Sequence, residues 1–124
     1  LSSLQYLRSM LPGENTGQRW QQLLSRLADK LGYQPDMEAV LLFIGIREAG
    51  LPPKKFTEKE ISELKQMAIC TLLVPARYYQ LFWVDDTGWP HFKELKRLPE
   101  MPVEDRNAFL KEYVLLYAEK NRLL

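Results

Sequence analysis

Residues 36–50 read Asp-Met-Glu-Ala-Val-Leu-Leu-Phe-Ile-Gly-Ile-Arg-Glu-Ala-Gly, and residues 39–46 carry no polar side chain. A bilayer span needs about 20 apolar residues, so this run is too short to cross a membrane and is better explained as a buried segment. Its flanks predict a helix over residues 36–49, because Asp36 can cap the first turn and Gly50 can take the left-handed conformation that ends it. A helix without a polar face must be covered by the rest of the chain. We therefore predict that the other elements pack around it.

Two helices are predicted before this central helix. Apolar residues at helical spacing from Trp20 to Leu31 form one stripe, which Asn15 or Thr16 can cap and Gly32 can end. Trp20 is interpreted as a core residue because it lies on that stripe. Four leucines among the first eleven residues suggest a shorter helix before it.

A further helix is predicted after the central helix, from about residue 58 to residue 73. It begins with a capping box, Thr57 to Glu60, in which the hydroxyl and the carboxylate each satisfy an amide of the first turn. Its second half carries no charge, so we expect that half to pack on the central helix. Gly45 and Ala68 are small enough to let the two helix axes approach closely.

The pattern changes after Pro75, where a β-hairpin over about residues 78–95 is predicted. Asp85-Asp86-Thr87-Gly88 has the composition of a turn that ends on a glycine at positive φ. Pro90 cannot donate a ladder hydrogen bond, so the return strand should lie at an edge. A lone hairpin is marginal in water, so we expect it to lie on the helices. A last helix with a broad apolar stripe opens at Val103.

Composition predicts one mostly α-helical globular domain over residues 1–124, with four or five helices and this one hairpin. The single cysteine, Cys70, cannot form an internal disulfide or a cysteine-based zinc site, and a cytoplasmic location is expected. Seventeen basic and sixteen acidic residues give a net charge of +1. This balance holds along the chain, so neither a nucleic acid nor a membrane is expected as partner.

The hairpin is the candidate functional surface, because aromatic side chains gather there together with the only histidine, His91. The aromatic residues of this segment are Tyr78, Tyr79, Phe82, Trp83, Trp89 and Phe92. Tryptophan and tyrosine supply many interface hot spots, and an edge strand can accept another chain. The sequence favours a noncatalytic protein-interaction module, with self-association as one option. Its expected binding residues are Tyr79, Phe82, Trp83, Trp89 and His91.

Two other interpretations stay open. In one, the hairpin aromatics only roof the helical core, which would bury both Trp83 and Trp89. In the other, the chain is a small metal-assisted hydrolase that uses Asp85, Asp86 and His91. The interaction module requires neither a metal nor a cofactor, and no catalytic residue is assigned to it.

The segment Asp85–His91, Asp-Asp-Thr-Gly-Trp-Pro-His, resembles an acidic-Gly-Trp-Pro-His segment of an uncharacterised family of short bacterial proteins. The resemblance extends to the central helix. It implies a similar small soluble fold and names no activity.

Overall fold

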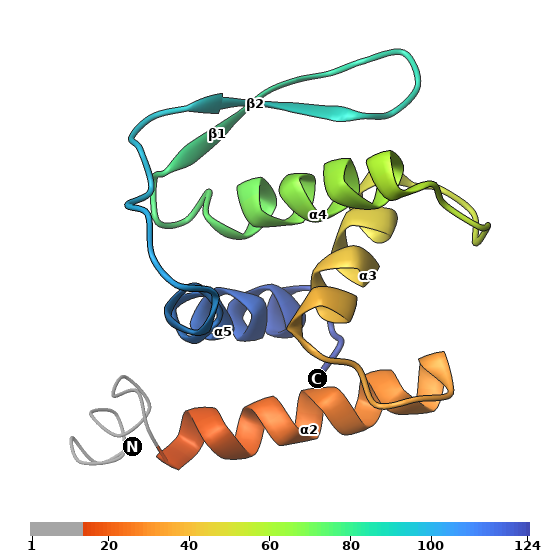
Figure 1. Ribbon diagram of the computed structural model, residues 1–124, viewed down its shortest axis with the longest axis vertical. Coiled ribbons are helices and arrows are strands. Elements are labelled where there is room, and N and C mark those ends of the chain that lie inside the picture. The colour runs from red at the N-terminus through yellow and green to blue at the C-terminus, as the bar shows by residue number, and fades with distance from the viewer. Residues whose placement is uncertain (1–13) are drawn as a thin grey trace. The chain divides into compact units, whose positions relative to one another are not determined.

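The computed structural model describes residues 14–124, which form four α-helices and one antiparallel two-stranded hairpin (Figure 1). The hairpin precedes the last helix in the sequence, which confirms the predicted fold class. The short helix predicted within the first eleven residues lies outside the described part of the chain. The elements are α2 (Glu14–Leu31), α3 (Met37–Ala49), α4 (Glu58–Leu72), β1 (Tyr79–Val84), β2 (Pro90–Glu94) and α5 (Val103–Lys120).

The chain divides into two compact units. One unit, Asp36–Pro102, contains α3, α4 and the hairpin, and the other contains α2 and α5. A single domain over residues 1–124 stays a prediction.

In the second of these units, α2 buries the predicted stripe and packs against α5. Trp20 is buried, as predicted, and Lys111 of α5 places its ammonium 5.4 Å from the centre of the indole ring. The predicted cap is wrong, because α2 already includes Asn15 and Thr16. The Thr16 hydroxyl instead donates to Glu112 Oε1 of α5 at 2.6 Å, so it links two helices. Gly32 ends α2 as predicted, with φ of +82°.

Helix α3 is the predicted apolar helix, and Arg47 is its only exposed residue. Asp36 caps it by accepting a hydrogen bond from the backbone N–H of Ala39 at 2.9 Å. At the other end, Gly50 adopts φ of +66° and donates its N–H to the carbonyl of Arg47. Both caps confirm the sequence prediction, and they fix the two ends of the buried segment.

Helices α3 and α4 cross in close contact. A Cβ atom added to Gly45 would overlap the carbonyl oxygen of Leu64 and lie 2.7 Å from its carbonyl carbon. Only a glycine therefore fits at this crossing. The prediction that Gly45 permits a close approach is confirmed, although the backbone it meets is that of Leu64, one turn before the buried Ala68.

Helix α4 begins with the predicted capping box. The Glu60 N–H donates to the Thr57 hydroxyl at 3.1 Å, and the Thr57 N–H donates to the Glu60 carboxylate at 2.9 Å. Lys54 also donates to this carboxylate, at 2.9 Å. The amide hydrogen bond from Thr57, followed by that from Lys54, lowers the pKa of Glu60 from an ordinary 4.5 to about 2.

The capping box makes stability depend on pH. Because the folded chain binds fewer protons at Glu60 than the unfolded chain, the carboxylate stabilises the fold above its ordinary pKa. We expect this contribution to be lost as pH falls from 4.5 to about 2. Thermal unfolding of Glu60→Gln at several pH values should show a weaker pH dependence in that window. Glu63→Gln, which removes an exposed carboxylate outside the box, is the control, and an equal effect of both variants would contradict the assignment.

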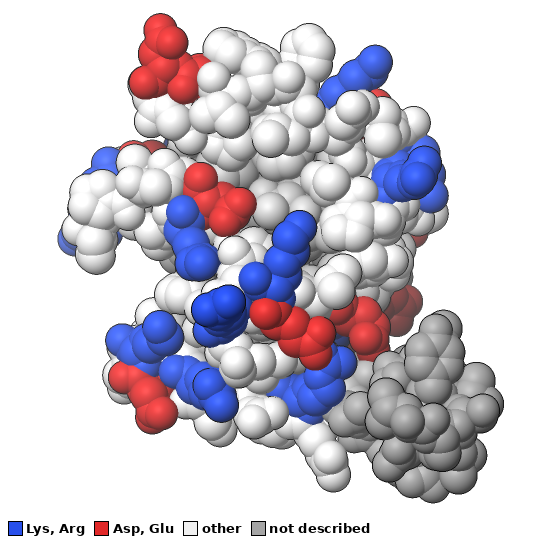
Figure 2. Space-filling view, turned by 180° about the vertical axis from the view of Figure 1, so that it is seen from behind, with Lys and Arg blue, Asp and Glu red and all other residues white. Residues whose placement is uncertain are grey.

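The surface charge agrees with the balanced composition. On the face shown in Figure 2, basic and acidic side chains are interspersed, and neither sign forms a large continuous patch. At the top of this view, where the hairpin lies in Figure 1, an acidic group and a basic group stand on either side of an uncharged stretch. Within residues 14–124, no helix combines the length and the apolar character that a membrane crossing requires.

Candidate functional site

The candidate site is built on the hairpin, whose register contains an irregularity in β1. Leu81 lies opposite Phe92, but the next pair is Trp83 with His91, so Phe82 is an extra residue without a partner of its own. Such a β-bulge shifts the alternation of side chains between the two faces of a strand. Phe82 and Trp83, the two residues at the bulge, are both exposed.

The turn of the hairpin has the predicted form. The Gly88 N–H donates to the Asp85 carbonyl at 2.9 Å, and Gly88 adopts φ of +87°. The Asp85 N–H then donates to the Trp89 carbonyl at 3.0 Å, which closes the end of the ladder.

The Asp85 carboxylate holds this turn together. Its Oδ1 accepts hydrogen bonds from the Thr87 hydroxyl at 2.6 Å, the Thr87 N–H at 2.9 Å and the Trp89 N–H at 3.1 Å. Its Oδ2 lies 2.8 Å from His91 Nε2. These contacts, that of the Thr87 hydroxyl most and that of His91 next, hold the pKa of Asp85 well below its ordinary range. Since the carboxylate is ionised, it can only accept, and His91 must carry its proton on Nε2.

His91 in turn supports Trp83 across the ladder. The two rings stack with their centroids 4.7 Å apart and an interplanar angle of 12°. A chain of contacts therefore runs from the turn through Asp85 and His91 to the indole of Trp83. Three of the residues that the sequence singled out are brought together, and one exposed aromatic ring is held in a fixed orientation.

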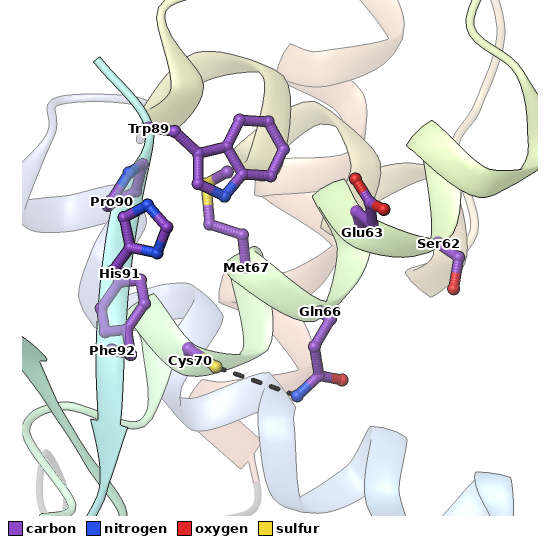
Figure 3. A pocket seen from close by; sticks show the side chains of 9 residues that line it. All are labelled: Ser62, Glu63, Gln66, Met67, Cys70, Trp89, Pro90, His91 and Phe92. Atoms are coloured by element: carbon purple, nitrogen blue, oxygen red, sulfur yellow. Dashed lines mark hydrogen bonds between the residues drawn. The ribbon is translucent and has the colours of Figure 1, made fainter. Parts of the chain in front are cut away.

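The hairpin has an inner side that covers the core of its unit. Trp89 and Phe92 pack against a cluster formed by Ala49, Leu64 and Met67. Figure 3 shows the indole of Trp89 lying over Met67. The roof interpretation is thus correct for Trp89.

The most exposed apolar side chains of the hairpin lie on β1. The exposed fractions are 50% for Leu81, 71% for Phe82, 51% for Trp83 and 53% for Val84. Tyr79, at the start of the strand, is half-buried, and desolvation raises the pKa of its hydroxyl. Leu81 and Val84 were missed as candidates. The signal that could have found them is the uncharged six-residue strand, which has apolar side chains on both faces.

A groove of about 480 Å³ lies between β2 and α4 (Figure 3). Its lining includes Glu63, Gln66 and Cys70 from α4, and His91 from β2. Gln66 Nε2 donates to Cys70 Sγ at 3.8 Å, and burial raises the pKa of the thiol. A raised pKa disfavours the thiolate, so Cys70 is suited to filling the core and not to nucleophilic attack.

The geometry gives little to a metal-assisted reaction. Asp85 and His91 form a pair, but among residues 14–124 no three histidine, cysteine or acidic side chains come together as a metal site. Asp86 therefore does not complete a three-residue site with that pair. The Asp85 carboxylate is already engaged by the turn, as expected for an aspartate at the head of a turn.

Replacing Asp85 tests this arrangement. We expect Asp85→Asn to speed amide hydrogen exchange at Thr87 and Trp89 several-fold, because the charged acceptor of four hydrogen bonds becomes a neutral one. Asp86→Asn changes the same charge at the neighbouring, exposed position and should leave these amides unchanged. Equal exchange in the two variants would show that the carboxylate of Asp85 does not hold the turn.

Models of known protein families, curated proteins and solved structures were each compared with the chain, and none of the three comparisons gives a significant match. The resemblance of the segment Asp85–His91 to a bacterial family therefore stays a prediction.

Proposed function

We propose that the protein is a noncatalytic interaction module that binds another polypeptide along β1. The observation that carries this proposal is the run of four consecutive exposed apolar residues, Leu81–Val84. Isolated apolar residues are common on protein surfaces, but a continuous exposed run usually marks an interaction site.

The mode of binding that fits this strand is the addition of a further strand to its edge. Only β2 pairs with β1 among the described residues, so the other edge of β1 has no strand beside it. An added strand would gain main-chain hydrogen bonds there, while exposed side chains would provide specificity.

The opposite edge of the hairpin is less suited to pairing. Pro90 has no N–H to offer, and the charged side chains of Lys93 and Glu94 are exposed. Proline and charged residues are typical protection against edge-to-edge association. β1 carries no such protection, which singles it out as the binding edge.

Trp83 is proposed as the anchor of the interface. Its ring is half exposed but already ordered by the stack on His91, so little side-chain entropy remains to be lost on binding. Phe82, the most exposed of the four, would contribute the largest newly buried apolar area. Trp89 is assigned to the core and not to the contact surface.

A photo-reactive benzoylphenylalanine at position 82 tests the proposal, because it keeps an aromatic ring at this exposed position and its added benzoyl group crosslinks to whatever lies against it. In lysate, we expect crosslinked adducts at position 82 and none at position 116. Leu116 is the control because it is also apolar and exposed (46%) but lies on α5.

A charged side chain at position 82 provides a complementary test by co-purification. Phe82→Lys should remove the proteins that co-purify with the wild type, whereas Leu116→Lys should retain them, because a lysine on the binding edge blocks strand addition. Equal crosslinking at both positions, or unchanged co-purification with Phe82→Lys, would overturn the proposal.

A further inference from the structure

We propose that the polypeptide bound by β1 is a second copy of this chain, paired antiparallel to β1 about a two-fold axis. This inference rests on the proposed function of β1 and names its partner. It is carried by the uncharged composition of the strand and by the signs of the charges at its two ends.

The strand is compatible with itself. It reads Tyr-Gln-Leu-Phe-Trp-Val from Tyr79 to Val84, so two copies side by side place no charged residue opposite another. Like charges directly opposite each other would be destabilising. Aromatic and branched apolar side chains across neighbouring strands, in contrast, are favourable pairs.

The ends of the strand distinguish the two possible directions. Arg77 precedes β1, and Asp86 follows it. Parallel pairing would bring each of these charges next to its own copy. Antiparallel pairing brings the basic end of one strand to the acidic end of the other, so that opposite charges meet.

A two-fold axis near the middle of β1 makes this match reciprocal. Arg77 and Asp86 lie in the turns just outside the two ends of the strand, so each side chain would reach toward its opposite on the partner. The two-fold axis repeats the contact, so each interface contains it twice. Both side chains are exposed, and within residues 14–124 neither takes part in an ion pair. Asp85 is engaged by the turn, which leaves Asp86 for the partner.

The first test is the mass of the intact chain in sedimentation equilibrium. We expect a concentration-dependent dimer for the wild type and for Leu116→Lys, and a monomer for Phe82→Lys. Circular dichroism of Phe82→Lys should be unchanged, because the side chain is exposed and outside the core cluster.

The second test exchanges the charges at the ends of β1. Arg77→Glu and Asp86→Arg should each weaken the dimer by roughly tenfold or more, because two attractive contacts become repulsive. An equimolar mixture of the two variants should form a heterodimer, in which each Glu or Asp again meets an Arg. The double variant Arg77→Glu/Asp86→Arg should recover the homodimer. Native mass spectrometry separates these species by mass.

The outcomes separate the two proposals. A wild type that stays monomeric at high concentration overturns self-pairing, while crosslinking at position 82 to other proteins would keep the interaction proposal. A dimer that persists in Phe82→Lys places the dimer interface elsewhere and overturns self-pairing through β1, while the interaction proposal is decided by the crosslinking and co-purification tests. A dimer that Phe82→Lys removes, but whose charge variants show no mutual rescue, overturns the antiparallel arrangement.

Discussion

Gly45→Ala is expected to lower the free energy of unfolding by about 3 kcal/mol, because overpacking at a rigid contact is costly. The new methyl group would overlap the backbone of Leu64, which cannot rotate away as a side chain would. Helices α3 and α4 would have to separate, and this would disturb the cluster on which the hairpin lies. Urea unfolding followed by circular dichroism measures the change.

Gly17→Ala is the matched control for this substitution. Gly17 lies in α2, and a Cβ atom added there meets nothing within 4 Å. Alanine is the better helix former, so this variant should be more stable than the wild type by about 0.5–1 kcal/mol. A Gly45→Ala protein as stable as Gly17→Ala would show that the close crossing of α3 and α4 is wrong.

Trp89→Ala is expected to destabilise the protein by about 2 kcal/mol. This is less than the truncation of a fully buried tryptophan would cost. Its indole covers the cluster that contains Leu64 and Met67, and truncation exposes that cluster to water. Native-state hydrogen exchange should show reduced amide protection in α4 as well as in the hairpin, because Trp89 connects the two.

Trp83→Ala provides the comparison on the open side of the same hairpin. Half of this indole is exposed, and its stacking partner is a single ring, so we expect a loss of about 1 kcal/mol or less. If Trp83 covered the core cluster instead, Trp83→Ala would lose more stability than Trp89→Ala. Equal losses would mean that the hairpin has no distinct inner and outer side.

Much of the fold could be predicted from local signals. The caps at Asp36, Thr57 and Gly50 depend on residues within one turn of each other, so they can be recognised without tertiary information. The helical spacing of apolar residues likewise predicts α2 without any information about α5, the helix against which it packs. The predicted cap of α2 was wrong because the Thr16 hydroxyl serves a long-range contact with Glu112, which no local pattern reveals.

The site was predicted less completely. The turn at Asp85 and Gly88 follows from turn chemistry, and the concentration of aromatic residues pointed to the hairpin. The bulge at Phe82 could not be predicted, because strands with apolar residues on both faces give no unique register. The assignment of Trp89 to the core and Trp83 to the surface depends on that register.

Amide hydrogen exchange along β1, at low and at high protein concentration, is the most direct test of the claim that this strand pairs with a second copy of the chain. The account predicts that amides of Tyr79–Val84 become protected as the concentration rises, while those of α2 and α5 do not change. Exchange in β1 that is independent of concentration, or protection that appears in another element, would contradict it.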